Sequence, residues 1–122
     1  MKEEIRLPHK HNNSLSGQKI ADIMPDDLMV TRVAEAMKQL GDPSRLRIFW
    51  LLCHTEECVI DIASIVNMTS PAVSHHLKLL KTAGLITSRR EGKEMFYKAA
   101  DTNLVKALHN TIEQIADITC PL

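Results

Sequence analysis

The feature that most constrains the fold is a change of hydrophobic period at Gly84. Before it, apolar residues recur at spacings of three and four, as they do along one face of a helix. After it, "LITSRR" and "EMFYKAA" alternate with a period close to two and flank "EGK", which predicts a β-hairpin that turns on Gly92. The chain therefore has to combine a helical part with one small hairpin.

The helical part contains start and stop signals that divide it into separate helices. Asp42 followed by Pro43 is a strong start signal, Gly84 is typical of a left-handed helix end, and Asp101 is the predicted N-cap of a last helix. The predicted helices span residues 26–40, 43–53, 59–67, 70–83 and 103–118. Four helices, a hairpin and a final helix indicate a winged helix-turn-helix, a mainly α fold with a small β-hairpin.

The length of 122 residues fits a single domain. Residues 1–24 show little periodicity, so we predict a flexible N-terminal arm there. The winged helix-turn-helix domain is predicted over residues 25–119, and residues 120–122 form a tail. A chain this short buries a limited share of its surface, so a dimer interface would help to stabilise it.

The cysteines, at positions 53, 58 and 120, are odd in number and show no paired framework. The opening residues carry no apolar signal stretch, and no run approaches the ~18 apolar residues that span a bilayer. We therefore expect a reduced, cytoplasmic protein without a membrane partner. Cys53 lies on the apolar stripe of the second helix and is predicted to belong to the core.

The fourth predicted helix has two contrasting faces. Val73, Leu77 and Leu80 form an apolar face that suits packing. Short polar residues lie opposite, near the helix start, and lysines lie further along, as suits a helix in a DNA major groove. The hairpin adds a local cationic cluster to a chain whose 15 Lys+Arg and 15 Asp+Glu balance. The predicted contacts to double-stranded DNA are Ser70, Ser74, His75, Lys78, Lys81, Arg89, Arg90 and Lys93. The alternative is a solvated amphipathic helix beside a charged turn.

Five blocks of the sequence, in this order, resemble a known family. They are "LGDPSRLRIFWLL", "EECVIDIA", "SPAVSHHLKLLKTAGLI", "RREGKEMFYK" and "ADTNLVKAL". Over about residues 33–117 the chain is similar to the ArsR/SmtB family of metal-responsive repressors. The resemblance implies a homodimer built on the first and last helices, which reads a two-fold-symmetric operator. It also implies that the metal-free dimer represses genes and releases the operator when metal binds.

In this family a stretch that resembles "ELCVxDL" carries a cysteine that often supplies a metal ligand. Here residues 57–61 have the sequence "ECVID", and Asp61 follows Cys58 by one helical turn, so both side chains can face the same way. By the same resemblance, an N-terminal arm, commonly that of the other subunit, completes the metal shell. His9 and His11 are the candidates for this role.

The predicted ligand set favours a particular class of ion. One thiolate, imidazoles and a carboxylate are borderline in softness, which favours Zn(II), with Cd(II) or Co(II) as alternatives. Relatives that sense cadmium or lead carry a second cysteine in this motif, where Ile60 stands here. Two interpretations without a metal-binding role stay open. A lone Cys58 can be a small buried hydrophobe, and His9 and His11 can be incidental.

Many relatives instead bind zinc between their last helices, through an Asp-x-His pair and a later His-x-x-His or His-x-x-Glu pair. The matching positions here are Asp101, Asn103, Gln114 and Asp117. Because carboxamides replace both expected imidazoles, the resemblance implies that this site is lost.

A different arrangement on the last helix stays open. His109, Glu113 and Asp117 fall at i, i+4 and i+8 and share a face, and Cys120 follows nearby. These residues form either another metal site, and so another way of sensing metal, or an exposed polar stripe with a tail thiol.

Two further classes of function compete with metal sensing. Cys58 near a helix start could make the repressor thiol- or redox-responsive. A metalloenzyme or zinc-storage protein could use the same ligands, but the sequence contains no nucleophile–base constellation, no Gly-rich phosphate loop and no His-Glu-x-x-His. We therefore predict a regulator without enzyme activity and without an organic small-molecule substrate.

Overall fold

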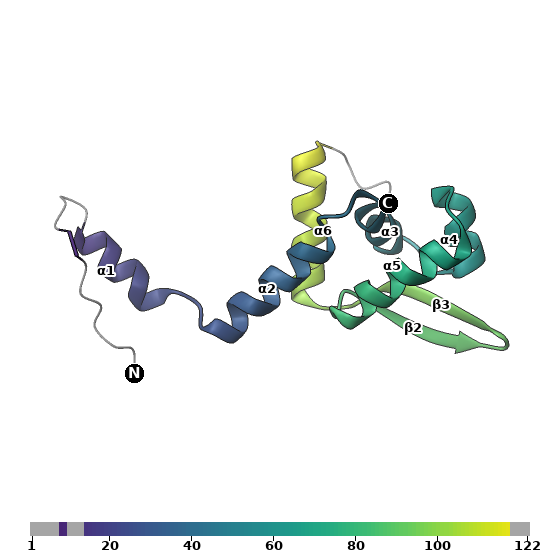
Figure 1. Cartoon of the computed structure of the whole chain (residues 1–122), viewed down its shortest axis with the longest axis horizontal. Coiled ribbons are helices and arrows are strands. Elements are labelled where there is room, and N and C mark those ends of the chain that lie inside the picture. Colours follow the sequence, from purple (N-terminus) through teal and green to yellow (C-terminus); the bar gives the residue numbers. More distant parts are fainter. Residues whose placement is uncertain (1–7, 10–13, 118–122) are drawn as a thin grey trace. The chain divides into compact units, whose positions relative to one another are not determined.

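A computed structural model of the chain describes residues 8–9 and 14–117 (Figure 1). By its internal contacts the chain divides, between Val33 and Ala34, into two compact units. No helix in the described part is long and apolar enough to cross a membrane.

The first unit holds a helix that the sequence did not predict. α1, Ser14–Ile23, lies where a loosely ordered segment was expected. A hydrogen bond of 3.1 Å from Gln18 Nε2 to Asp22 Oδ1 joins side chains one turn apart on its surface. The helix is short, so its apolar residues give too brief a pattern to detect.

α2, Asp27–Gln39, is the first helix that the sequence predicted. Asp26 Oδ1 accepts a hydrogen bond of 2.9 Å from the backbone N–H of Met29. The acidic residues before this helix therefore satisfy a donor of its first turn, and the predicted start is confirmed.

The second unit contains the winged helix-turn-helix. Its elements are α3 (Pro43–Leu52), β1 (Glu57–Cys58), α4 (Val59–Val66), α5 (Ser70–Thr82), β2 (Ile86–Glu91), β3 (Glu94–Ala99) and α6 (Asn103–Ala116). The strands form an antiparallel sheet in the order β1-β3-β2. β1 was not predicted, and it pairs Glu57 with Tyr97 and Cys58 with Phe96. The predicted hairpin is confirmed, and it turns at Gly92, where φ is +63°.

The ends of the helices test the start and stop signals individually. Asp42 Oδ1 accepts hydrogen bonds from the backbone N–H groups of Ser44 and Arg45, at 3.1 and 3.4 Å, so the predicted cap of α3 is confirmed. Gly84 follows α5 with φ +77°, as its left-handed role requires. The predicted cap of the last helix is wrong. Thr102, not Asp101, caps α6, because its Oγ1 accepts the N–H of Val105 at 3.2 Å.

One buried core joins α3, α4, α5 and the hairpin. α5 contributes Val73, Leu77 and Leu80, each at most 1% exposed, so the predicted packed face is confirmed. Phe49 of α3 is fully buried in the same core, and Cys53 packs against it as predicted. Because one side of α5 is fixed in the core, its opposite side faces outward.

Candidate DNA-binding surface and metal centres

The outward side of α5 carries the polar residues that were predicted to contact DNA. Ser74, His75, Lys78 and Lys81 are exposed, and Ser70, the first residue of the helix, is half-buried. Figure 1 shows α5 beside the β2–β3 hairpin, and a hydrogen bond of 2.6 Å from Lys81 Nζ to Ser88 Oγ joins the two. The helix and the hairpin therefore form one continuous surface.

On the hairpin, Arg89 is bound to carboxylates. Its guanidinium lies 2.7 Å from Glu56 Oε1 and 2.7 Å from Glu91 Oε2, and it stacks over the ring of Phe96 at 5.1 Å. The hydrogen bond to Glu56 raises the pKa of Arg89, and the same bond lowers the pKa of Glu56. Since Arg89 is already paired, a DNA phosphate would have to compete with two carboxylates for it.

The other two predicted hairpin cations have a different environment. Arg90 and Lys93 are both exposed, and no ion pair within residues 8–9 and 14–117 involves either of them. They are therefore better placed than Arg89 to meet a phosphate.

A polar network that the sequence did not reveal holds α5 to α3. Arg45 Nε donates to His76 Nδ1 at 3.2 Å, and Arg45 Nη1 donates to Gln39 Oε1 at 2.8 Å. Gln39 is buried, and its amide nitrogen donates to Glu35 Oε1 at 2.8 Å. Every polar atom named here has a partner, so the network fixes the orientation of α5 at little desolvation cost.

Stability is expected to depend on the protonation of His76. Burial lowers the pKa of His76, with Arg45 and His75 acting in the same direction and Asp42 opposing them. Because the folded pKa lies below the unfolded value of about 6.5, the unfolded state binds the proton first as pH falls. The stabilisation is therefore fully present above about pH 6.5 and is lost as pH falls toward the folded pKa.

We accordingly expect the thermal midpoint to drop between pH 7.5 and 5.5, and to drop less in His76→Gln, which keeps a hydrogen-bond acceptor for Arg45. His75→Gln is the control, because His75 is exposed next to the same position. Part of the slope should remain in His76→Gln, since burial also lowers the pKa of His54. Equal slopes in both variants would contradict this role of His76.

The residues predicted to bind metal lie in different parts of the chain. Cys58 is 7% exposed and is the N-cap residue of α4, and Asp61 is exposed in the first turn of that helix. His9 is exposed in the first unit, whereas His11 lies outside the described residues. Assignment of these residues to one site stays a prediction.

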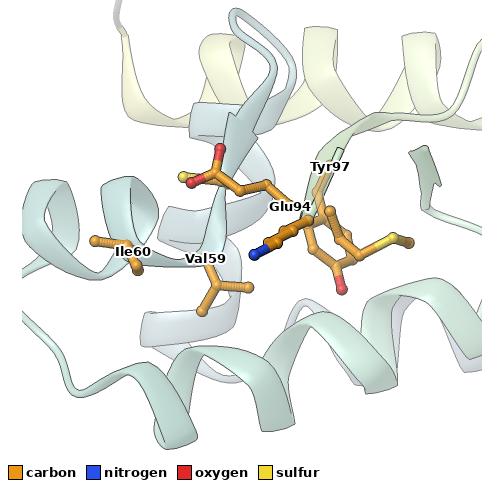
Figure 2. Close-up of a pocket in the computed structure, with 7 residues that line it drawn as sticks. Val59, Ile60, Glu94 and Tyr97 are labelled. Carbon is orange, nitrogen blue, oxygen red and sulfur yellow. The ribbon is translucent and has the colours of Figure 1, made fainter. Parts of the chain in front are cut away.

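A pocket of about 280 Å³ lies beside Cys58, between the start of α4 and the hairpin. Figure 2 shows Val59 and Ile60 on the α4 side of the pocket, and Glu94 and Tyr97 on the β3 side. Cys58 is itself one of the lining residues. Cys58 is therefore buried in the fold and is also one of the residues that border this pocket.

A second group of potential ligands includes a residue that sequence reasoning missed. His54, in the turn after α3, lies with its Nε2 3.0 Å from Nε2 of His109 on α6. Glu113 Oε1 lies 3.0 Å from the same His109 nitrogen. The three ligand atoms lie within 4.8 Å of one another, and among the described residues they make the one such group of three.

The expected grouping on the last helix is therefore partly different from the observed one. His109 and Glu113 share a face, as their spacing predicted. Asp117 is an exposed C-cap residue outside the group, and Cys120 lies outside the described residues. His54 could not be found by spacing, because it joins α6 only through the tertiary fold.

The surroundings of His54 favour its neutral form. Burial lowers the pKa of His54, and His109 lowers it further, while Glu113 opposes both. In the described part of the chain, Glu113 Oε2 is buried and has no hydrogen-bond partner. The ring of Trp50 lies 4.4 Å from that of His54, which places an aromatic side chain beside the group.

A polar helix face held beside a hairpin on a helical core defines a regulator of the winged helix-turn-helix class. The model of a family described as "Bacterial regulatory protein, arsR family" matches residues 42–88. The chain belongs to this family, which confirms the resemblance inferred from its sequence blocks.

Three similar proteins illustrate the match. A Transcriptional repressor SmtB homolog of Synechocystis is 31% identical over 82% of this chain and 75% of its own length. A Cadmium resistance transcriptional regulatory protein CadC homolog of Staphylococcus aureus is 38% identical over 83% and 80%, respectively. The solution structure of a homodimeric winged helix-turn-helix DNA-binding domain from Mycobacterium bovis has a TM-score of 0.67 and 32% identity over 76% of this chain and 88% of its own.

These comparisons confirm the predicted fold and class. The family and the relatives are transcriptional regulators, so the chain is a regulator and not an enzyme.

Proposed function

We propose that this protein is a dimeric, DNA-binding transcriptional repressor that releases its operator when a divalent metal ion binds. The observation that carries the proposal is the two-sided α5, which buries Val73, Leu77 and Leu80 and exposes the polar side chains opposite. A helix supported in this way beside a hairpin is the arrangement that enters a major groove.

Each part of this surface has its own task in the proposed complex. We assign Ser74 and His75, near the start of α5, to base edges, and Lys78 and Lys81 to phosphates, because all four side chains are exposed. Arg90 and Lys93 extend the phosphate contacts onto the hairpin. Because the chain has no net charge, affinity depends on this local cluster.

The proposed dimer uses α2, which is the first helix that the sequence predicted, and α6, which is the last. Ile115 of α6 is 82% exposed, so its apolar side chain is available for an interface. In the first unit, Leu28, Met29 and Val30 of α2 are also at least 48% exposed. The solved relative from Mycobacterium bovis is described as homodimeric, which supports the same assembly here.

The proposed metal ligands are Cys58 and Asp61, completed by His9 and His11, with Zn(II) as the ion and Cd(II) or Co(II) as alternatives. The setting of Cys58 gives such an ion a physical route to the DNA-binding surface. Cys58 pairs with Phe96 of β3, and the nearby Glu56 holds Arg89 of β2. An ion that moves this segment would therefore act on the hairpin. The names of the SmtB and CadC homologs support a metal-linked repressor.

The test is an operator titration with and without Zn(II). A coupling free energy of about 1–3 kcal/mol would weaken operator binding about 5–150-fold in the presence of zinc. We expect Cys58→Ser and Asp61→Asn to lose most of this effect, while Cys53→Ala, a second thiol variant, retains it. Unchanged affinity of the wild type in zinc would reject metal sensing and leave DNA binding intact.

The same titration separates the thiol-based alternative. Cys58 is one of the residues that line a pocket, which is the observation that favours that candidate. A repressor that responds to peroxide through Cys58, and whose zinc response survives Cys58→Ser, would support the thiol switch over the metal site.

A further inference from the structure

We propose that His54, His109 and Glu113 form a metal site within one protomer, which binds a borderline divalent ion such as Zn(II) through two imidazoles and a carboxylate. The site shares no ligand with Cys58 and Asp61. Its existence does not rest on the proposed function, although any effect of this ion on operator release would.

The first argument is the distance between the ligand atoms. His109 Nε2 lies 3.0 Å from both His54 Nε2 and Glu113 Oε1. Ligand atoms around a tetrahedral zinc ion, at about 2.0–2.1 Å from the metal, are about 3.3 Å apart. Two of the three separations are therefore near the value that an ion requires, and all three atoms lie within 4.8 Å of one another. Side-chain rotations would have to bring the three atoms to equal separations around an ion.

The second argument is the supply of protons in the group. His109 Nε2 carries either one proton or one lone pair, but it faces two close partners. A single N–H at this atom has to be shared between His54 and Glu113, or one contact is left without a proton. An ion placed among the three atoms would accept a lone pair from each of them.

The third argument is the buried carboxylate oxygen. Glu113 Oε2 has no hydrogen-bond partner in the described part of the chain, and the Glu113 side chain is only 13% exposed. A buried acceptor without a partner is destabilising. A cation bound at the other oxygen of the same carboxylate would offset this cost, because it neutralises the charge.

The ligands are held by two elements of the second unit. His109 and Glu113 lie one turn apart on α6, and the backbone N–H of His54 bonds the carbonyl of Leu51 at 3.0 Å, which anchors the turn after α3. The ring of Trp50 lies against that of His54 in a tilted arrangement, with the ring centroids 4.4 Å apart. Three protein ligands leave an open position that a water molecule would fill.

The alternative is a hydrogen-bonded triad that only joins α3 to α6. Both interpretations predict that loss of His54 or His109 lowers stability, so stability alone cannot separate them. Direct ion binding does, because a structural triad has no affinity for metal.

The experiment uses the full-length chain with the four other proposed ligands removed by His9→Gln, His11→Gln, Cys58→Ser and Asp61→Asn. In this background we expect one Zn(II) or Co(II) per protomer by calorimetry. Co(II) should also quench the emission of Trp50, which is the one tryptophan of the chain and lies 4.4 Å from the His54 ring. The Co(II) spectrum should lack a thiolate charge-transfer band.

The added variants are His109→Gln and Glu113→Gln, with His75→Gln as the matched control at an exposed histidine. We expect each ligand variant to lose at least ~100-fold in affinity, more than the loss of an outer-shell partner causes, and the control to bind like the background. Circular dichroism confirms that each variant is folded. Absence of ion binding in the folded background, or equal affinity in the ligand and control variants, would overturn the proposal. Operator binding is not measured, so failure here leaves the proposed function intact.

Discussion

Lys78→Glu is expected to weaken operator binding by about 100-fold. Lys78 is exposed on α5 opposite the buried face, and in the proposed complex it contacts a DNA phosphate. A symmetric dimer carries the change twice, and a loss of about 1.4 kcal/mol at each half-site corresponds to tenfold. Lys78→Ala should weaken binding less and should lower the salt slope of the association constant by about 2 per dimer, one for each lost phosphate contact.

The measurement is fluorescence anisotropy of a labelled duplex selected by the wild-type protein, at several salt concentrations. Arg47→Glu is the matched control, since Arg47 is exposed on α3, outside α5, the hairpin and the proposed dimer helices, and undergoes the same change of charge. If net charge alone governed affinity, both variants would lose the same amount. Equal losses in the two variants would contradict the placement of Lys78 at a phosphate.

The elements that were predicted well are those whose signals are local. The Asp42–Pro43 start, the glycine at the hairpin turn and the apolar face of α5 each depend on residues close in sequence. Such signals act through backbone dihedral preferences and through caps that involve neighbouring residues only. The order of the elements then limits the fold to few arrangements.

The features that sequence did not reveal depend on distant partners. β1 is two residues long and exists because Glu57 and Cys58 pair with β3. Likewise, Arg89 counts as a hairpin cation in the sequence, but the fold places it against Glu56. The incorrect prediction of the N-cap of α6 has another cause. Asp101 and Thr102 are adjacent and both suit an N-cap, so the sequence does not choose between them.

The candidate sites show the same division between features set by local signals and features set by distant partners. Spacing on one helix identified the shared face of His109 and Glu113, but His54 is 55 residues away from His109 in sequence. In the same way, His76 adjoins a residue that sequence reasoning chose for DNA contact, yet its partner is Arg45 of α3. Ligand and hydrogen-bond partners that lie on different elements require the tertiary structure.

Phe49→Ala is expected to lower the free energy of unfolding by about 3–5 kcal/mol. Phe49 is fully buried in α3, in the core that also holds the packed face of α5. Removing its ring loses both the transfer free energy and the contacts around the cavity that remains. Urea unfolding at one fixed protein concentration measures the change, because a dimer's stability depends on concentration. Ile65→Ala is the control, since Ile65 is 56% exposed and its loss should change stability by less than about 0.5 kcal/mol outside an interface.

Phe49→Ala and Lys78→Glu should separate the effects on stability from the effects on operator recognition. Phe49→Ala leaves the exposed side of α5 unchanged, so operator affinity, expressed per folded molecule at low temperature, should stay within a few-fold of wild type. Lys78→Glu changes an exposed side chain and should leave the unfolding midpoint nearly unchanged. If Phe49→Ala weakened the affinity of folded protein as strongly as Lys78→Glu does, the core would be setting the position of α5 directly. DNA binding could not then be assigned to the exposed side chains alone.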